Sequence, residues 1–340
     1  MNRRQLVKGM LATGAVTLAG AGCADSGATK TGKLSIGQVS KSIAFFAMFV
    51  ATEKGYFEDE GVTFEEPAVL GTGSKVAAAL KSGSIELGGG VMTDVLKLSE
   101  TGDALSLVAD MVDTYYIDII TGTKFEGAAV DASLDERIAS LKGKKIGITG
   151  PGSGTEALVV YLFKKGGMDA KKDAELVNLG SEATAALGAL KGGQVDALSF
   201  AQPLAQQAEG AGTGTTYISP CRGDVPGLQH VSHGVMFTTQ SVMKKKSKEI
   251  AAFQGALVRA RKDIQGGDSA EIKKLLAAYR SGMPDSALEA LLPLLKEEIR
   301  ATNGFPRSSF DASVAFHKAS GLITKGPDYD QLVPANLREA

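Results

Sequence analysis

The alternation of strand-like and helix-like segments constrains this chain more than any other feature of its sequence. Short runs rich in Val, Ile and Leu predict strands, and amphipathic runs of helical period separate them. Strands are expected at residues 34–39, 62–66, 85–88, 105–111, 117–122, 144–149, 175–179, 195–200 and 231–238. Helices are expected at residues 44–53, 74–81, 155–165, 183–191, 247–266, 269–280, 286–302 and 309–320. This order predicts an α/β fold with mostly parallel sheets and a C-terminal helical tail.

Length and composition exclude several classes of protein. The 340 residues are 44% hydrophobic, which is enough to build the cores of two domains. A net charge of −1 gives no basic surface for nucleic acid, so we expect no nucleic-acid partner. The chain has only 3 His and 2 Cys, too few for a metal centre made of several such ligands. We therefore expect no bound metal and no other cofactor.

A short internal repeat divides the chain into two similar parts. The segment Ala79–Leu87 returns as Ala189–Ala197, with conservative pairs such as Glu86 and Asp196. Each copy reads as a helix stopped by glycine and followed by a strand. A chance match of so short a segment is the alternative. If the repeat is real, it predicts two similar α/β lobes with a ligand cleft at the carboxyl ends of their strands.

The N-terminal segment is typical of an export signal rather than of a fold. Arg3 and Arg4 precede an apolar, small-residue run of about 14 residues, which is too short for a transmembrane helix. The paired arginines resemble a twin-arginine export signal. Residues 1–22 are thus predicted to be a signal peptide, and residues 23–32 a tether to the first strand.

Cys23 follows this run and resembles the lipidated cysteine of bacterial lipoproteins. Gly20 departs from the Leu that such cleavage sites favour. A chance cysteine beside an ordinary cleavage site is the alternative. Lipidation would place the protein on the outer face of the cytoplasmic membrane, held by its lipid anchor, and ordinary cleavage would place it in the periplasm.

The glycine-rich segment Gly150–Thr155 is the sharpest local motif. It follows a predicted strand and opens a predicted helix, so that free backbone N–H groups could hold an anion or a polar group. The alternative is a plain helix cap, because Ser153-x-x-Glu156 fits a capping box. The segment lacks the Lys of a P-loop, and Pro151 makes it a poor dinucleotide fingerprint.

Three other features can also be interpreted either as ligand-binding residues or as residues with a purely structural role. Gly71–Ser74 opens a helix, with Ser74 as its N-cap candidate. In the cluster of aromatic residues that begins at Phe45, helical spacing lets at most one or two side chains line a cleft. His233 is expected to be a polar core or hinge residue, and Cys221 an inert thiol.

The chain resembles the periplasmic solute-binding proteins of nitrate/sulfonate/taurine-type ABC transporters. The segment Ala51–Val62 fits that family's A-x-x-x-G-Y/F-F-x-x-x-G-L/V pattern. Both copies of the repeat and the segment Leu141–Gly147 resemble other recurrent segments of the family. The likeness extends over roughly residues 33–240, and the helical tail carries no specific motif.

The resemblance implies a periplasmic-binding-protein fold of type II, with two lobes that close on a ligand. Lobe one would comprise residues 33–118 and 230–340, and lobe two residues 122–226. The hinges would lie near residues 117–124 and 226–234. The resemblance also implies a monomeric binding protein, not an enzyme, that delivers a small solute to ABC permease subunits.

The family's ligand loops map onto five segments of this chain. The site residues that they imply are Ser40, Phe45, Phe46, Gly71, Thr72, Gly73, Ser74, Met92, Thr93, Ser153, Gly154, Thr155, Phe200 and Gln202. No Arg in these loops could fork onto a carboxylate. Hydroxyls, backbone N–H groups and Phe side chains favour a sulfonate-, nitrate- or aromatic-acid-like solute.

Two other functions stay open on the sequence. One is an enzyme on the same fold, like the thiamine-pyrimidine synthases that the family resembles, although the export signal and the scarcity of His and Cys speak against it. The other is a sensor or adhesion lipoprotein.

Overall fold

A computed structural model describes residues 32–339 of the chain. The predicted signal peptide and the predicted lipidation of Cys23 lie outside the described residues. Among the helices that are described, none combines the length and the apolar character needed to cross a membrane.

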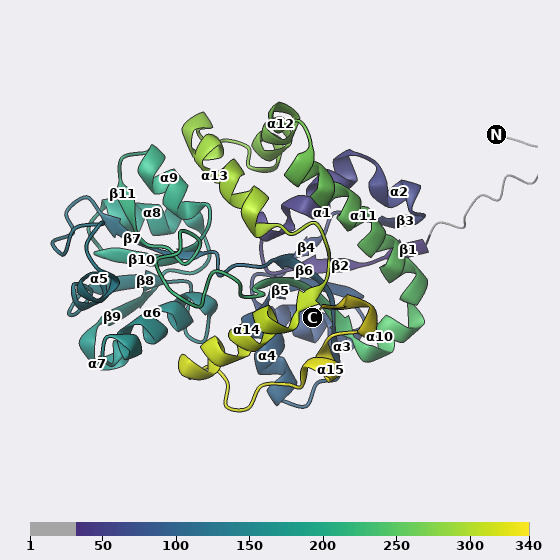
Figure 1. The fold of residues 1–340 in the computed structure, drawn as a ribbon, viewed down its shortest axis with the longest axis horizontal. Coiled ribbons are helices and arrows are strands. Elements are labelled where there is room, and N and C mark those ends of the chain that lie inside the picture. Colours follow the sequence, from purple (N-terminus) through teal and green to yellow (C-terminus); the bar gives the residue numbers. More distant parts are fainter. Residues whose placement is uncertain (1–31, 340) are drawn as a thin grey trace, which may run out of the picture. The chain divides into compact units, whose positions relative to one another are not determined.

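The first sheet has five strands in the order β4-β2-β5-β12-β6 (Figure 1). Their bounds are β2 (Ile36–Gln38), β4 (Ala68–Val69), β5 (Leu87–Val91), β6 (Leu105–Val112) and β12 (Gly234–Thr239). Four strands run in one direction, and β12 opposes its neighbours β5 and β6. Beside this sheet, β1 (Gly32–Leu34) pairs in parallel with β3 (Val62–Phe64). The strand expected at 34–39 is thus divided at Ser35, because its two halves pair with different partners.

The second sheet has five strands in the order β11-β7-β10-β8-β9. Their bounds are β7 (Ile117–Gly122), β8 (Lys145–Ile148), β9 (Glu175–Asn178), β10 (Ala197–Ala201) and β11 (Gly214–Ile218). Again four strands run in one direction, and β7 opposes its neighbours. The prediction of mostly parallel sheets is therefore confirmed.

The two sheets have the same topology, and the internal repeat occupies equivalent places in them. Read from the opposite edge, the second sheet (β9-β8-β10-β7-β11) matches the first position by position. The two copies of the repeat lead into β5 and β10, which are the central strands. The Glu86 carboxylate accepts a hydrogen bond of 3.1 Å from the Ser35 amide, and the Asp196 carboxylate accepts one of 2.8 Å from the Lys145 amide. Each acid thus fixes the start of the neighbouring strand.

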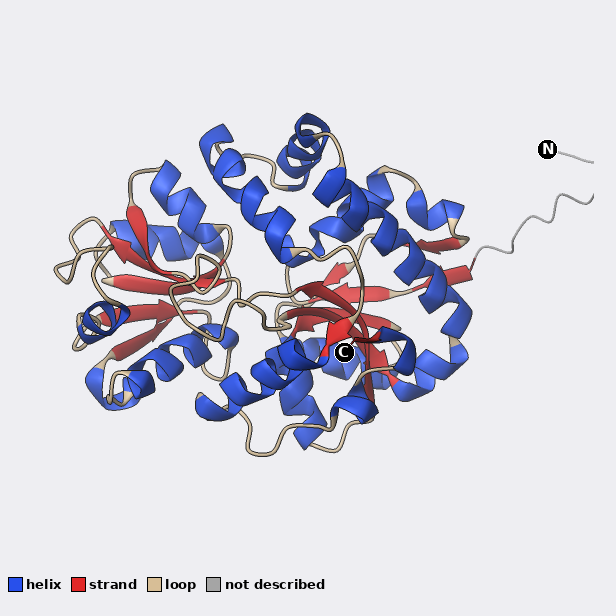
Figure 2. Ribbon diagram, viewed as in Figure 1, coloured by secondary structure: helices blue, strands red, loops and turns tan. Residues whose placement is uncertain are grey.

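Helices cover both sheets (Figure 2). Those that follow strands of the second sheet are α5 (Leu134–Ala139), α6 (Gly154–Lys165), α7 (Ala170–Asp173), α8 (Ala183–Lys191) and α9 (Leu204–Gly210). Those of the first part of the chain are η1 (Ile43–Phe45), α1 (Phe46–Glu53), α2 (Tyr56–Asp59), α3 (Gly73–Ser82) and α4 (Met92–Glu100). After β12 the chain forms α10 (Gln240–Lys245), α11 (Ser247–Gly266), α12 (Ser269–Tyr279), α13 (Asp285–Glu298), β13 (Phe305–Pro306), α14 (Arg307–Ala319), α15 (Tyr329–Leu332), η2 (Ala335–Leu337) and β14 (Arg338–Glu339).

The chain passes between the sheets twice before the helical tail. Residues 113–116 connect β6 to β7, and residues 219–233 connect β11 to β12. Helices of the tail then contact both sides, because α13 packs on α9 and α14 packs on both α4 and α6. Helix α13 ends at Glu298 rather than at the expected residue 302, since Ile299 adopts an extended backbone. The lobe and hinge boundaries stay predictions, although β7 takes residues 117–118 into the second sheet.

Candidate functional site

The predicted ligand loops follow the carboxyl ends of parallel strands in both sheets. Ser40 follows β2, and Gly71–Gly73 follow β4 and open α3. In the second sheet, Gly150–Ser153 follow β8 and Gln202 follows β10. This is the edge at which open α/β sheets bind ligands.

At the start of α6, Ser153 acts as the N-cap. Its hydroxyl accepts a hydrogen bond of 3.3 Å from the Glu156 amide and lies 2.7 Å from the Thr155 hydroxyl. The Glu156 carboxylate accepts from the Gly152 amide at 2.5 Å, so the reciprocal bond of a full capping box to Ser153 is replaced by one to Gly152. The Ser153 side chain is therefore committed to the helix end in this structure.

Helix α3 begins differently from the expectation. Thr72, rather than Ser74, is the N-cap, and its hydroxyl accepts from the Lys75 amide at 3.3 Å. Its first residue, Gly73, lies against Asp94, because a Cβ placed on Gly73 would lie 2.1 Å from the Asp94 carboxyl carbon. Glycine is thus required there for the close approach of α3 and α4. Burial raises the pKa of Asp94 to about 6.

The apolar side chains expected to line a cleft are buried in the hydrophobic cores. Phe45 and Phe46 belong to the core between α1 and α11, Met92 to the core around α4, and Phe200 to the core around α8. Each is at most 4% exposed. Thr93 is also buried, and its hydroxyl lies 2.7 Å from His317 Nε2 on α14. Three of these apolar side chains lie on helices and Phe200 lies on strand β10, and all four face hydrophobic cores.

Elements attached to the two sheets meet at Gly152 and Gly154. The Lys97 ammonium group on α4 donates to the Gly152 carbonyl at 2.9 Å, and the Tyr115 hydroxyl donates to the Gly154 carbonyl at 2.6 Å. The ring of His233 lies 4.1 Å from that of Tyr115, centre to centre. His233 is fully buried, its two ring nitrogens have no hydrogen-bond partner among residues 32–339, and burial lowers its pKa well below the ordinary value. His233 thus contributes a neutral side chain that packs one segment crossing between the sheets against Tyr115 of the other.

A second group of polar side chains lies where α13 meets the second sheet. We call it the Glu298 cluster: Asp118, Gln202 and Cys221 lie near Glu298, and Gln206 belongs to α9, the helix on which α13 packs. The Gln202 amide and the Cys221 thiol lie beside the Glu298 carboxyl group. Backbone hydrogen bonds join two of these residues to the segment that connects β6 to β7. The backbone N–H of Gln202 donates to the Tyr116 carbonyl at 2.9 Å, and the backbone N–H of Asp113 donates to the Glu298 carbonyl at 3.1 Å.

Polar atoms of the Glu298 cluster are buried without partners. Within the described residues, both carboxyl oxygens of Glu298, both polar atoms of the Gln202 side chain, Gln206 Oε1 and Asp118 Oδ1 lack a hydrogen-bond partner. Burial raises the pKa of Glu298 to about 8 and that of Asp118 to about 6. Burial, with smaller effects of Asp94 and Glu298, raises the pKa of Tyr116 to about 12. Unpaired polar groups at this depth are costly unless a ligand or a proton satisfies them.

Of the Glu298 cluster, Gln202 is among the predicted site residues and Glu298 is not. Glu298 lies on the helical tail, where no motif pointed to a site. One signal was available, because Glu298 follows Leu291 and Leu295 at helical spacing and so falls on the buried face of α13. An acid on an apolar stripe is uncommon without a partner or a function.

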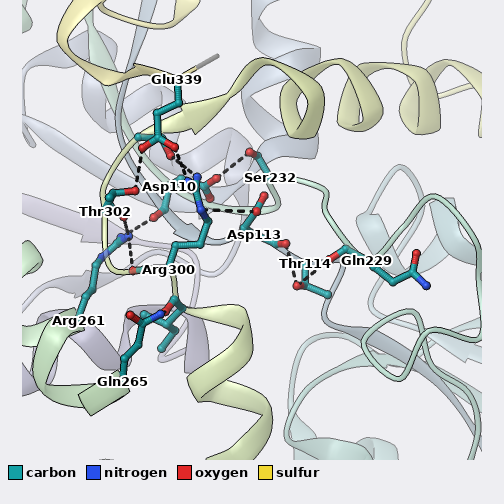
Figure 3. A network of polar contacts seen from close by, with 12 residues as sticks. Asp110, Asp113, Thr114, Gln229, Ser232, Arg261, Gln265, Arg300, Thr302 and Glu339 are labelled. Atoms are coloured by element: carbon teal, nitrogen blue, oxygen red, sulfur yellow. Dashed lines mark hydrogen bonds and ion pairs between the residues drawn. The ribbon is translucent and has the colours of Figure 1, made fainter. Parts of the chain in front are cut away.

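A network of ion pairs and hydrogen bonds fastens the connecting segments to the tail (Figure 3). The Ser232 hydroxyl donates to Asp110 at 2.7 Å, and the Thr114 hydroxyl donates to the Gln229 carbonyl at 3.1 Å. Arg300 pairs with Asp113 at 3.8 Å and also with Glu339. Burial and the neighbouring Asp113 raise the pKa of Asp110 to about 8. Both chain crossings between the sheets are thus held by residues far apart in the sequence.

Comparison with known proteins identifies the family. The model of the NMT1-like family matches residues 27–279, which is most of the chain. The chain belongs to the NMT1-like family. A relative of this NMT1-like protein is YtlA of Bacillus subtilis, which is 23% identical over 310 residues, covering 90% of this chain and 89% of YtlA.

Solved structures share the fold of this NMT1-like protein. A protein from Bordetella bronchiseptica superposes with a TM-score of 0.72 at 24% identity, covering 90% of this chain and 95% of that one. The alkanesulfonate-binding protein SsuA from Xanthomonas axonopodis superposes with a TM-score of 0.67 at 21% identity, covering 92% and 99%. The nitrate-binding protein NrtA from Synechocystis also gives 0.67, at 15% identity, covering 91% and 87%. The periplasmic-binding-protein fold and the family resemblance found in the sequence are confirmed.

The described part of this NMT1-like protein offers no preformed metal site. No group of three or more His, Cys, Asp or Glu side chains within residues 32–339 is placed to hold an ion. Cys221 is the free thiol of the described residues, and burial raises its pKa well above the ordinary value. A thiol that stays protonated at neutral pH is a poor nucleophile.

Proposed function

We propose that this NMT1-like protein is the extracytoplasmic solute-binding component of an ABC importer. It would capture one small solute between its two sheets and present that solute to permease subunits. The fold of SsuA and NrtA, which bind alkanesulfonates and nitrate, supports this function.

One observation carries the proposal. Elements that follow the carboxyl ends of β5 and β8, in two sheets of the same topology, are in contact through Lys97 and Gly152. Open α/β sheets bind ligands at this edge. When the two edges lie close together, loops from both sheets can contact the same solute, and when they separate the site is incomplete. Such a site encloses a solute when it closes and releases it when it opens.

Closure would involve the two connecting segments. We expect residues 113–116 and 219–233 to act as hinges, because they carry the two chain crossings between the sheets. Small-angle scattering with and without solute tests this motion. An unchanged radius of gyration at saturating solute would contradict the hinge.

The cellular location is part of the proposal. An export signal in residues 1–22 and lipidation of Cys23 would keep the protein on the outer face of the cytoplasmic membrane. Replacing Cys23 with Ser should release processed, soluble protein into the periplasm. Membrane retention of Cys23→Ser equal to that of the wild type would show that Cys23 is not the anchor.

An enzyme is the second candidate, because the desulfurization enzyme DszB also has this fold. DszB superposes with a TM-score of 0.60 at 15% identity, covering 90% of this chain and 97% of that one. Mass spectrometry of the solute after incubation with the protein separates the two functions. A binding protein returns the solute unchanged, and an enzyme returns a product.

The deciding experiment is a thermal-shift screen of the mature protein with sulfonates, nitrate, amines, pyrimidines and aromatic acids. A solute present at about a hundred times its Kd stabilises the folded state by about 2.7 kcal/mol. Hits are then titrated by calorimetry. A screen in which no solute of any class raises the melting temperature would contradict the proposed function.

A further inference from the structure

The Glu298 cluster holds more acceptors than donors, and its donors are the Gln202 side-chain nitrogen and the Cys221 thiol beside the Glu298 carboxyl group. Glu298 and Gln202 are each 3% exposed, Gln206 is 2% exposed and Asp118 is 1% exposed. Of their six unpartnered atoms, five are oxygens and one is the Gln202 side-chain nitrogen. Among the ion pairs of residues 32–339, none involves Glu298 or Asp118. The cluster is therefore an acidic, acceptor-rich region between α13 and the second sheet.

We infer that the solute carries a cationic or N–H-donating nitrogen group, and that this group binds to the carboxyl group of Glu298 and the side-chain amide of Gln202. This inference rests on the proposed function, because it assumes that a solute is bound between the sheets. It goes beyond that function by naming the chemistry at one end of the solute.

The chemistry of the two side chains decides the polarity of the ligand group. An ionised carboxylate only accepts hydrogen bonds, and an amide oxygen accepts as well. An ammonium, amidinium or amino group offers two or more N–H donors and can satisfy both residues at once. A sulfonate, nitrate or carboxylate in the same place would put acceptor against acceptor and like charge near like charge.

The surroundings of Glu298 strengthen this preference. Asp118 faces it from β7, Cys221 from the segment after β11, and Glu297 adjoins it on α13. These neighbours are acidic or carry no charge, and the Arg222 guanidinium, which lies close enough to Asp118 to lower its pKa, is paired with Glu209 at 3.4 Å. Burial therefore keeps Glu298 protonated in the solute-free protein at neutral pH, with its pKa near 8. A cation that binds there must displace this proton, so that binding releases a proton to the solvent.

Position also suits the role. Gln202 follows β10 at the carboxyl-end edge of the second sheet, and Glu298 ends α13, whose Leu291 and Leu295 lie in the core that also holds Leu87 of β5 in the first sheet. The two residues thus come from opposite sides of the proposed closure. A group bridging them would favour the closed form, since it contacts both sides only there.

Matched pairs of probes test the inference. Taurine and ethanesulfonate differ by one amino group, and benzamidine and benzoate place a cation or an anion on the same ring. Calorimetry at pH 7 should show that the nitrogen-bearing member of at least one pair binds about tenfold tighter or more. The Glu298→Gln variant should lose about tenfold or more of that affinity, and Glu297→Gln, at an exposed position on the same helix, should bind like the wild type.

The same titrations give a second readout. Heats measured in phosphate and in Tris buffer should show proton release on binding to the wild type, and Glu298→Gln should abolish that release. Three results would overturn the inference: equal affinity for both members of each pair, wild-type affinity in Glu298→Gln, or failure of all four probes to bind at millimolar concentration. Tight binding of another solute in the last case would leave the proposed function standing.

Discussion

The Lys97 ammonium group donates a hydrogen bond of 2.9 Å to the carbonyl oxygen of Gly152. Lys97 belongs to α4, which follows β5 of the first sheet, and Gly152 belongs to the loop that follows β8 of the second. Gly152 has φ of +74°, a conformation that favours glycine, and a Cβ there would lie 2.8 Å from the Lys97 nitrogen. The loop is thus shaped to receive this contact, which joins the carboxyl-end edges of the two sheets.

Replacing Lys97 with Ala should shift the solute-free protein toward a more open form. Lys97 is exposed, so the bond contributes only about 0.5 kcal/mol, but closure is expected to depend on few such contacts. Small-angle scattering should report a larger radius of gyration for Lys97→Ala. Lys81→Ala serves as control, since Lys81 pairs with Asp103 on the same side of the molecule. Equal radii for Lys97→Ala and wild type would show that this contact does not hold the closed form.

Two glycine-to-alanine variants should have opposite effects on stability. At Gly154 an added Cβ would lie 3.2 Å from both Ile117 Cδ1 and the Tyr115 hydroxyl, and 3.4 Å from His233. Gly154→Ala should therefore lower the free energy of unfolding by about 1–3 kcal/mol. Gly188 lies inside α8 with nothing within 4 Å of an added Cβ, so Gly188→Ala should raise it by about 0.5–1 kcal/mol. Urea titrations measure both, and equal effects would contradict the crowding at Gly154.

Ser153→Ala separates the two interpretations of the Gly150–Thr155 motif. Loss of the cap on the Glu156 amide should cost about 1 kcal/mol of stability and lower the melting temperature. If the hydroxyl serves only the helix, solute affinity measured by calorimetry stays unchanged. A loss of affinity without a loss of stability would instead show that Ser153 contacts the solute. Ser133→Ala, at the capped start of α5, is the matched control.

Periodicity in the sequence was enough to predict most of the elements and their order. The helix expected at 247–266 is α11 without a change of boundary, and the strand expected at 117–122 is β7. The repeat also located the two central strands, because Glu86 and Asp196 serve equivalent strand starts. These elements could be predicted because the spacing of apolar residues along a helix or strand determines which of its faces is buried.

The site was harder to predict, since it depends on contacts between distant segments. Spacing could not show that Phe45 and Phe200 would turn into the cores, because both faces of their elements carry apolar residues. Glu298 meets Gln202 only through the packing of α13 on α9. No pattern within one segment reports a contact that forms across about a hundred residues of chain.

The contribution of Glu298 to the free energy of unfolding should fall as the pH rises from about 4.5 to about 8. Burial raises the pKa of Glu298 from 4.5 to about 8 in the folded protein. Between these values the unfolded chain has released its proton while the folded protein still holds it. At Glu298 the folded state therefore binds more protons, which lowers the free energy of unfolding as the pH rises across this window. The buried His233 and His317, whose pKa values burial lowers from 6.5, act in the opposite direction in the acid part of the window. Asp110, whose pKa is raised to about 8 by burial and by Asp113, should act in the same direction as Glu298.

Glu298→Gln isolates the contribution of Glu298 to this pH dependence. Glutamine resembles the protonated acid and cannot ionise, so the variant should lose less stability than the wild type between pH 5 and pH 8. The difference should be on the order of 4 kcal/mol at pH 8 and near zero at pH 4. Urea unfolding of solute-free protein at each pH measures it, and Glu297→Gln, at the exposed neighbour, should follow the wild-type curve. Parallel curves for Glu298→Gln and the wild type would mean that Glu298 is already ionised at neutral pH. A partner or water would then satisfy its carboxylate in the solute-free protein.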